Sequence, residues 1–374
     1  MPEAEGKVVD DVGALQAFHG AWDKLAVAAS RPFCAPGWLM PWWRHAAPAG
    51  AGLRAVVVLD GEELIGVGPL YEERRGGLRW WRPLGAGACE RVEPLAGTGR
   101  EQEVAGAIAR AIAAAKPDVV TFEGVPAPCP WPSMLATGWP GRRGPWLARR
   151  AGSTAPTVDL GGRDFDDWFM TRTGHFRQRA RKIRKDFAAK GGTERLATED
   201  SMERDLDSFA RLHRARWEER GGSHALTPGV ERMLRQSGRE LGLDRLRVLS
   251  LDVGDATIAS GVAVAAGAEL AYWLNGFDIA YAALSPSRLG ILSVIEDGVR
   301  LGARRVDLGE GDFEYKQRFA DGEDALEWLW LAPPGPRQLL VRSLLAAARL
   351  RRAASERLPT NARARLLGLV RKSQ

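Results

Sequence analysis

Cysteine is scarce in this sequence, and the few cysteines are widely separated. The 374 residues include three, Cys34, Cys89 and Cys129, and their spacing forms neither a CxxC motif nor a Cys/His cluster. His175 and His213 are equally isolated and lack the spacing of metal ligands. We therefore expect free thiols in a reducing compartment, structural histidines and no bound metal.

The sequence also lacks the signature loops of several enzyme classes. It contains no Walker A loop, no GxSxG or HExxH motif and no recognisable Rossmann fingerprint. Kinase, hydrolase and dehydrogenase functions therefore have no support from motifs.

No stretch of the sequence is suited to crossing a membrane. The longest uncharged run, from Gly124 to Gly141, contains five prolines, and proline at that density prevents a continuous helix. The first residues, MPEAEGKVVDDVG, are acidic and include no apolar segment of the kind found in secretory signals. These features predict a cytoplasmic protein.

The composition is that of an ordinary globular protein whose positive charge is concentrated at one end. Apolar residues make up 45% and charged residues 27%, and the length suits two domains. The net charge is +6, but the segment from Arg337 to Gln374 holds ten basic residues and one acid. Residues 1–336 are therefore slightly acidic in sum, so the total charge does not indicate a protein-wide affinity for nucleic acid.

The pattern of hydrophobic residues predicts an α/β protein in which one order of elements occurs twice. In each half, helical sequence is followed by three antiparallel strands, a helix and a further strand. The first half is expected to contain a helix at 11–28, strands at 54–59, 63–72 and 78–84, a helix at 101–115 and a strand at 118–123. The second half is expected to contain helices at 165–190, 202–220 and after Pro228, strands at 245–251, 257–265 and 269–275, a helix at 286–301 and a strand at 305–308. We divide the chain into residues 1–150, residues 151–335 and a basic helical tail, 336–374, with the proline-rich segment 124–145 connecting the halves.

The most informative stretch comprises the last helix of the second half and the strands on either side of it. Ser285 is a typical N-cap residue and Pro286 suits the first position of a helix. The first turn then carries Ser287, Arg288 and Gly290. Free backbone N–H groups, the positive end of the helix dipole and an arginine together form an anion site, for which a pyrophosphate is the natural occupant.

These elements and several short motifs resemble the GNAT acyltransferase fold, and more narrowly its double-GNAT branch. That branch contains the Fem-type aminoacyltransferases and the acetyltransferases grouped with the CelD/BcsL cellulose-biosynthesis protein. The matching residues are Phe33, Pro36-Gly37-Trp38, Asp60-Gly61-Glu62, Gly68-Pro69-Leu70, Arg172–Lys185, Ser285-Pro286-Ser287-Arg288-Leu289, Asp307-Leu308-Gly309-Glu310-Gly311 and Tyr315-Lys316-Gln317-Arg318-Phe319. The resemblance covers nearly the whole chain to about residue 335. The usual GxGxG/A phosphate loop is absent, and only Arg288 and Gly290 correspond to it.

The resemblance implies two tandem GNAT-like units, each a mixed, largely antiparallel sheet flanked by helices. It implies that acetyl-CoA or another acyl-CoA supplies the acyl group and that the second unit carries the active site, whereas the first unit is expected to bind no cofactor. Backbone N–H groups at 274–276 would stabilise the acyl oxygen. The residues implied to contact the donor are Leu274, Asn275, Gly276, Ser285, Ser287, Arg288, Leu289 and Gly290.

Formation of an amide requires the amine to lose a proton and the leaving thiolate to gain one. By resemblance, Glu310 or Asp312 could accept a proton, Tyr315 could donate one, and Lys316 could orient a substrate carboxylate or stabilise negative charge. Each of these could instead be a solvated, ion-paired or packed side chain. The expected acceptor-binding residues are Arg177, Arg181, Trp217, Tyr272, Trp273 and Asp278, of which Asp278 could instead cap a turn.

Three functions are compatible with these residues. The first is acyl transfer from acyl-CoA to an amine of a small molecule or of a glycan or peptide precursor. The second is tRNA-dependent aminoacyl transfer, in which the basic helix at 172–185 and the tail would hold tRNA. The third is a non-catalytic accessory role, in which the tail makes weak peripheral contact with a membrane or binds a partner enzyme. A helical hairpin packed against the second unit is the alternative for the tail.

Overall fold

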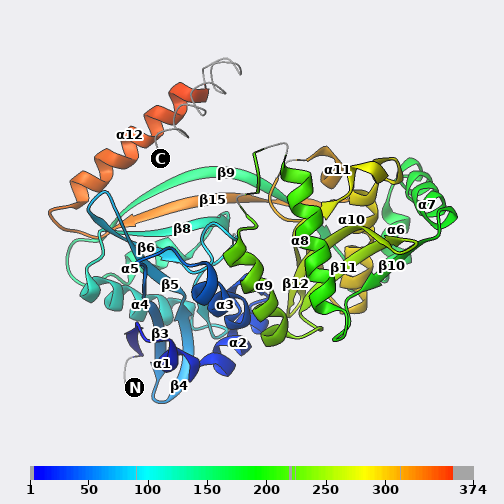
Figure 1. The fold of residues 1–374 in the computed structure, drawn as a ribbon. Coiled ribbons are helices and arrows are strands. Elements are labelled where there is room, and N and C mark those ends of the chain that lie inside the picture. Colours follow the sequence, from blue (N-terminus) through cyan, green and yellow to red (C-terminus); the bar gives the residue numbers. More distant parts are fainter. Residues whose placement is uncertain (1–3, 90, 219–220, 224, 312, 357–374) are drawn as a thin grey trace.

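Two long strands, β9 (Trp146–Asp159) and β15 (Gly322–Ala332), connect the two halves of a mixed α/β structure (Figure 1). The computed structural model describes residues 4–356 apart from 90, 219–220, 224 and 312. Before β9 the chain forms β1 (Glu5–Val9), α1 (Val12–Gln16), α2 (His19–Ala28), η1 (Pro32–Cys34), α3 (Pro36–Ala46), β2 (Gly52–Leu53), β3 (Ala55–Asp60), β4 (Glu63–Gly68), β5 (Leu70–Arg75), β6 (Leu78–Pro83), β7 (Leu95–Ala96), α4 (Glu101–Ala115), β8 (Val119–Pro126) and α5 (Trp131–Thr137).

The second half has the same general order of elements. After β9 come α6 (Phe165–Thr171), α7 (Gly174–Ala189), β10 (Gly192–Leu196), α8 (Met202–Glu218), α9 (Pro228–Leu241), β11 (Leu246–Val253), β12 (Ala256–Ala266), β13 (Glu269–Phe277), η2 (Ile279–Leu284), α10 (Pro286–Arg300), β14 (Arg305–Asp307) and α11 (Glu314–Gln317), then β15 and α12 (Gln338–Glu356). The expected α4 and α10 begin where the sequence indicates, and β11, β12 and β13 lie within two residues of their expected bounds.

Some expected elements differ from the structure. The single helices expected at 11–28 and 165–190 are each two helices. In the latter, α7 starts as a separate helix because the Thr173 side chain caps it by accepting a hydrogen bond from the Phe176 N–H. The single strand expected at 63–72 is two strands, β4 and β5. Strands β1, β2, β7, β9, β10 and β15 and helices α3, α5 and α11 were not expected. The division at 150/151 lies inside β9.

The strands form a four-stranded sheet, in the order β1-β3-β4-β7, and an eleven-stranded sheet, in the order β10-β11-β12-β13-β14-β9-β15-β8-β6-β5-β2. In the larger sheet β9 pairs with β14 of the second half, whereas β15 pairs with β8 of the first half. The two strands also pair with each other in antiparallel register from Gly322–Thr157 to Ala332–Trp146. One continuous sheet therefore passes through both halves.

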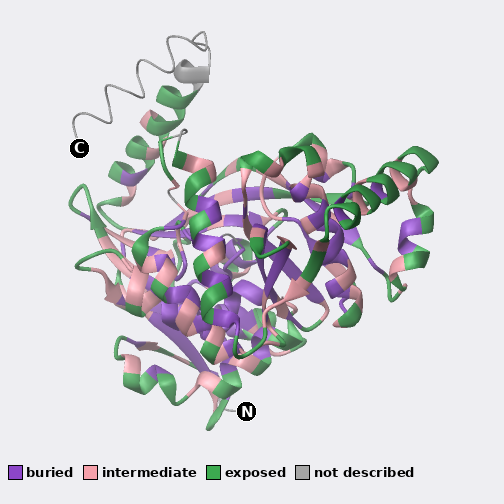
Figure 2. Cartoon of the chain, turned by 45° about the vertical axis from the view of Figure 1, so that its right-hand side comes forward, coloured by how far each residue is buried: buried purple, intermediate pink, exposed green. Residues whose placement is uncertain are grey.

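Each half contains a parallel strand pair connected by a helix. In the first half, α4 connects β6 to β8, which pair only at Trp80–Val119 and Trp81–Val120. In the second half, α10 connects β13 to β14, which pair only from Glu269–Arg305 to Ala271–Asp307. Apolar side chains of α4 and α10 pack against these strands in separate buried clusters. Figure 2 shows that buried residues fill the middle of the molecule.

Helix α12 lies at the first-half end of the larger sheet. Val341 is fully buried there with Leu78, Val119 and Ala332, whereas Leu339, Leu340, Leu344 and Leu350 are exposed. Beyond this contact with β15 the helix points away from the remainder of the molecule (Figure 1), and the helical hairpin considered for the tail stays a prediction. Residues 357–374, including the second tail helix expected after Pro359, lie outside the described residues. Among the described helices, none is long and apolar enough to cross a membrane.

A buried ionic network fixes the first half to the parallel strand pair of the second. Arg91 is 6% exposed, and its guanidinium lies 3.0 Å from Asp307 and 3.0 Å from Asp324. Its Nη1 also lies 4.0 Å from Glu269. Burial, followed by repulsion from Asp307, raises the pKa of Glu269. Asp307 in turn accepts a hydrogen bond from Gly309 N–H at 2.8 Å, so the network also orders the loop after β14.

Replacing Arg91 with leucine is expected to destabilise the protein by about 3–5 kcal/mol, because buried carboxylates lose their cation. Urea unfolding at pH 7 measures this change. The matched control is Arg100→Leu, which removes a partly exposed arginine paired with Asp60 and Glu103 and should shift the midpoint much less. Equal midpoint shifts in the two variants would contradict this role for Arg91.

Candidate active site

The active-site candidate lies where β13 and β14 separate. Their ladder ends at Ala271–Asp307, and β13 continues beside β12 alone. A register shift between Val262 and Ala263 of β12 places an extra residue, Trp273, in β13. This bulge turns two consecutive side chains, Trp273 and Leu274, toward the first half, where both pack against its core. A bulged strand beside an open edge presents backbone groups that a ligand can use.

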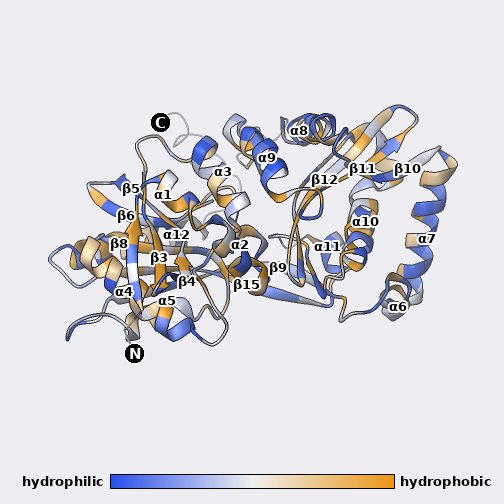
Figure 3. Ribbon diagram, turned by 90° about the horizontal axis from the view of Figure 1, so that it is seen from below, coloured by the Kyte–Doolittle hydropathy of each residue, from blue (hydrophilic) through white to orange (hydrophobic). Residues whose placement is uncertain are grey.

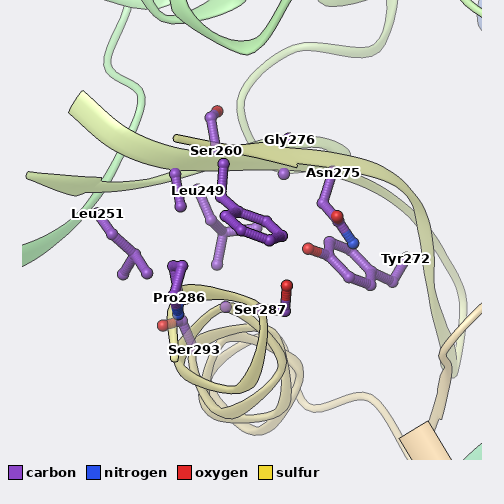
Figure 4. Close-up of a pocket in the computed structure, with 13 residues that line it drawn as sticks. Leu249, Leu251, Ser260, Tyr272, Asn275, Gly276, Pro286, Ser287 and Ser293 are labelled. Atoms are coloured by element: carbon purple, nitrogen blue, oxygen red, sulfur yellow. The ribbon is translucent and has the colours of Figure 1, made fainter. Parts of the chain in front are cut away.

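A small cavity lies between β13 and the first turn of α10. It has a volume of about 20 Å³ and is lined by residues of β11, β12, β13 and α10. In Figure 4 the hydroxyls of Tyr272 and Ser287 both point into this space. Gly261 permits this position of Tyr272, because an added Cβ would lie 2.6 Å from its ring. Gly290 faces the same tyrosine, since an added Cβ there would lie 3.5 Å from its hydroxyl.

Arg216 of α8 gathers a polar cluster at the end of β13. Its Nη1 donates to the Asn275 side chain at 2.9 Å, and its guanidinium stacks over Phe277 at 4.4 Å. The Asn275 side chain lies near the hydroxyls of Tyr272 and Tyr315 and favours the ionised form of both. Burial raises the pKa of both tyrosines, and the nearby Arg216 opposes this shift. The structure therefore brings Tyr272, Asn275 and Tyr315 together, as residues of one candidate site.

Helix α8 approaches β13 closely because Gly276 has no side chain. An added Cβ would lie 2.3 Å from the backbone nitrogen of His213. His213 is buried, and its Nδ1 lies 2.8 Å from the carbonyl oxygen of Asn275. Burial lowers the pKa of this histidine. Its contacts are those of a structural residue.

A second cavity, of about 430 Å³, lies on the other side of the α10 N-terminus, between α7, α10 and the end of α11. Arg179, Arg288 and Arg318 line it above an apolar floor that includes Phe176 and Leu292. Burial and then repulsion from Arg179 and Arg318 lower the pKa of Arg288. The side chains of Arg179 and Arg288 donate no hydrogen bond to a described residue, whereas the Arg318 guanidinium pairs with Glu314. Three converging guanidinium groups with so little compensation favour an anionic ligand.

The start of α10 differs in one detail from expectation. Ser285 occupies the N-cap position and Pro286 the first turn, but Ser285 has φ 55° and its side chain forms no capping hydrogen bond. The first turn contains no acidic residue. By contrast, the first turn of α4 in the other half carries Glu101 and Glu103, which would repel an anion.

Lys316 is buried and supports the loop after β14. Its Nζ donates to the carbonyl oxygens of Gly309 and Glu310, at 3.2 and 3.0 Å. The loop lies beside β13, because an added Cβ at Gly309 would lie 2.8 Å from the Tyr272 carbonyl oxygen. The observed contacts of Lys316 are therefore those of a loop-positioning residue.

Glu310 projects to the opposite face of β13 from Tyr272. It accepts a hydrogen bond from Ser153 Oγ and borders a cavity of about 330 Å³ between the halves, here called the central cavity. Trp273 and Leu274 line the same cavity. The bulge thus borders the central cavity on one face, while Tyr272 and the start of α10 lie on the other. Asp312 lies outside the described residues.

Several predicted site residues have structural contacts instead. Leu289 is fully buried in an apolar cluster with Phe187 and Leu251. Asp278 accepts a hydrogen bond from Ala280 N–H at 2.9 Å, which is the turn-capping alternative. Two predicted arginines of α7 contact the protein itself: Arg177 donates to the carbonyls of Met170 and Arg172, and Arg181 lies over the Phe169 ring. Of the predicted tryptophans, Trp217 lies beside His213, and Trp273 donates to the Ala88 carbonyl. The functional roles of all these residues stay predictions.

Sequence reasoning missed Arg179 and Arg318 as members of the arginine-lined cavity. Arg179 lies in a helix with many other basic residues, which is largely hydrophilic along its length (Figure 3). The packing of α7 beside α10, which the sequence does not reveal, brings Arg179 to the cavity next to Arg288. Within the described part of the chain, no group of histidine, cysteine and acidic residues could hold a metal.

Comparisons with known proteins agree with this geometry. Residues 174–317 match the family described as "Acetyltransferase (GNAT) domain". FemX superposes with a TM-score of 0.58 at 11% identity, over 86% of this chain and 96% of that one. The C-terminal domain of a putative lysylphosphatidylglycerol synthetase from Agrobacterium fabrum superposes with a TM-score of 0.56 at 11% identity, over 87% of this chain and 95% of that one. L-PGS from Bacillus licheniformis superposes with a TM-score of 0.53 at 12% identity, over 90% of this chain and 97% of that one. No curated protein matches the chain.

At these identities the likeness concerns the fold. The expectation of an α/β protein with mixed, largely antiparallel sheets flanked by helices is confirmed. The second half also contains the match to the acetyltransferase domain. The narrower resemblance to the CelD/BcsL group stays a prediction.

Lys316→Met is expected to destabilise the protein by about 1–3 kcal/mol, because buried carbonyl oxygens lose their hydrogen-bond donor. Thermal and urea unfolding measure the change. Lys190→Met is the control, since Lys190 is exposed at the end of α7. An unchanged unfolding midpoint in Lys316→Met would show that the lysine does not position the loop.

Proposed function

We propose that this protein transfers an acyl group, most simply acetyl, from acyl-CoA to an amine of a small molecule or of a glycan or peptide precursor. The observation that carries the proposal is the open edge of bulged β13 beside an α10 N-terminus with an arginine-lined cavity. The match of residues 174–317 to an acetyltransferase domain supports it.

The residues around α10 fit a CoA-type donor. Such a donor supplies an activated thioester at one end and carries phosphates at the other. The N–H of Ser287 in the first α10 turn, the positive end of the helix dipole and the guanidinium of Arg288 would hold phosphate oxygens. Arg179 and Arg318 border the same cavity and add positive charge. The N–H groups at the β13 bulge, near Leu274, would stabilise negative charge as it develops on the acyl oxygen.

The acceptor amine would approach from the central cavity. Its nitrogen forms a bond to the acyl carbon, the carbon–sulfur bond breaks, and the amine loses a proton. Glu310 borders this cavity and would accept that proton, directly or through water. Tyr315 is the group we assign to protonate the departing thiolate, since burial keeps its hydroxyl protonated to higher pH than usual.

An aminoacyl-tRNA donor is the second candidate, because FemX has a similar fold. The contacts of α7 favour it less. Lys182 pairs with Asp186 at 2.8 Å and Arg184 with Glu296 at 2.9 Å, and Arg177 donates to backbone carbonyls. Much of the positive charge expected to follow a tRNA backbone therefore stabilises the fold.

Arg288→Ala is expected to weaken acetyl-CoA binding by about 10- to 100-fold, because a charge-assisted phosphate contact is lost. Isothermal titration calorimetry measures the dissociation constant. Lys182→Ala, on the exposed side of α7, should leave it unchanged. Absence of acetyl-CoA binding to the unmodified protein, with salt-dependent binding of charged tRNA, would replace the proposal by the second candidate.

Tyr315→Phe is expected to lower kcat by about 100-fold without changing the dissociation constant of acetyl-CoA, because the thiolate loses its proton donor. Since the pKa of Tyr315 is raised, the unmodified enzyme should keep this donor protonated, and the deficit should be constant from pH 6 to pH 9. Thiol release with an accepted amine measures the rate.

The matched control is Tyr71→Phe, which removes a buried hydroxyl that has no hydrogen-bond partner among the described residues. It should retain full activity. A fall in the activity of the unmodified enzyme centred below pH 9, absent in Tyr315→Phe, would contradict the assigned protonation state.

A further inference from the structure

Two cavities meet at one tryptophan on the acceptor side of the sheet. The central cavity lies between the halves, and a larger cavity of about 730 Å³, here called the α12 cavity, lies between β9, β15 and α12. Glu310 and Trp328 line both. A ligand that fills the central cavity can therefore extend past Trp328 toward α12.

Trp328 is held in a fixed position between the two cavities. Its ring lies against Gly152 of β9 so closely that an added Cβ would lie 1.8 Å from a ring carbon. The Arg150 guanidinium lies 4.5 Å from the ring centroid. This packing makes Trp328 a rigid surface at the junction.

The α12 cavity is strongly basic. Four arginines line it, Arg149, Arg150, Arg349 and Arg352, and the one acidic residue among its lining residues is Glu310. Arg149 pairs with Glu327 at 3.1 Å, and Arg349 donates to the Arg149 carbonyl. The Arg150 side chain donates no hydrogen bond to another described residue. Burial and then repulsion from Arg352 lower the pKa of Arg150, and the Glu310 carboxylate opposes this shift in part. This charge is suited to a phosphate or another anion.

The central cavity presents the opposite charge next to the β13 bulge. Glu123 lines it, but both of its oxygens are bound by Arg82, at 2.7 and 2.6 Å. Glu310 instead accepts from the neutral hydroxyl of Ser153. Its carboxylate, between the Trp273 and Trp328 walls, is therefore the natural partner of an ammonium group.

We propose that the acceptor is an amine with an anionic group, most simply a phosphate, at its other end. The amine lies at Glu310 and the anion at Arg150 and Arg352, with the connecting segment along Trp328. This inference rests on the proposed function for the identity of the reaction, but the binding of such a ligand does not depend on the donor. It gives α12 a specificity-determining role, because the C-terminal helix supplies part of the anion site.

A series of ω-aminoalkyl phosphates of two to six carbons tests the proposal, with ω-amino alcohols of equal length as neutral partners. Calorimetry without any donor measures binding, and thiol release with acetyl-CoA measures transfer. At the length that reaches both groups, we expect the phosphate to bind at least about tenfold more tightly than the alcohol. An ω-amino carboxylate series distinguishes phosphate from carboxylate as the anion.

Arg150→Gln and Arg352→Gln should each remove most of the preference for the phosphate and leave binding of the alcohols unchanged. Arg342→Gln is the control, because Arg342 lies over Trp146 outside the α12 cavity. Unfolding midpoints establish that each variant is folded. Because Arg150 contacts Trp328 whereas Arg352 lies on α12, the same loss of preference in both variants would come from the anion site and not from a disturbed Trp328.

Equal binding of phosphates and alcohols at every length would overturn the inference, as would a preference that survives both substitutions. If acetyl-CoA binds but this preference is absent, the inference fails and the proposed function stands. If the preference is present and depends on Arg150 while no acyl-CoA binds, the proposed donor fails and the acceptor class stands.

Discussion

The antiparallel ladder between β9 and β15 is the contact on which the remainder of the structure depends. The strand order at the centre of the larger sheet is β14-β9-β15-β8. Strand β9 therefore pairs with β14 of the second half, and β15 pairs with β8 of the first half. Strand β9 follows the first half in the chain but pairs with a strand of the second, and β15 follows the second half but pairs with a strand of the first. Each half therefore needs a strand from the other to complete its part of the sheet. The constraint fixes the distance and orientation of the halves, because backbone hydrogen bonds tolerate little displacement.

The candidate site uses that fixed relation. The β13 bulge turns Trp273 and Leu274 toward the first half, while Tyr272 and the start of α10 lie on the opposite face. Cavities therefore border this one strand on both of its faces. Arg91 belongs to the first half, yet it binds Asp307 at the end of β14. Through Asp307 and Gly309 the first half helps to order the loop that carries Glu310.

The sequence was sufficient where local rules determine the structure. Pro286 and the apolar stripe after it predicted α10, and the turns at Gly254 and Gly267 separated the three strands before it. Strand β9 was missed because Arg149, Arg150 and Gly152 interrupt a period-two pattern, and because its partners are distant in the chain. Helix α3 was missed since it contains Pro41 in its interior. In the site, the first turn of α10 was recognisable, but the convergence of Arg179 and Arg318 on Arg288, and the cluster around Arg216, are products of tertiary packing.

The pairing of β8 with β15 has a consequence for how the chain is made. Strand β8 ends at Pro126 and its partner begins at Gly322, so the ribosome completes almost the entire second half before β8 can be paired on that side. Until then the first half presents an open strand edge to the cell. Such an edge can pair with other chains. Efficient production of this protein therefore depends on keeping that edge covered during synthesis, and shortening the chain before β15 would leave it open permanently.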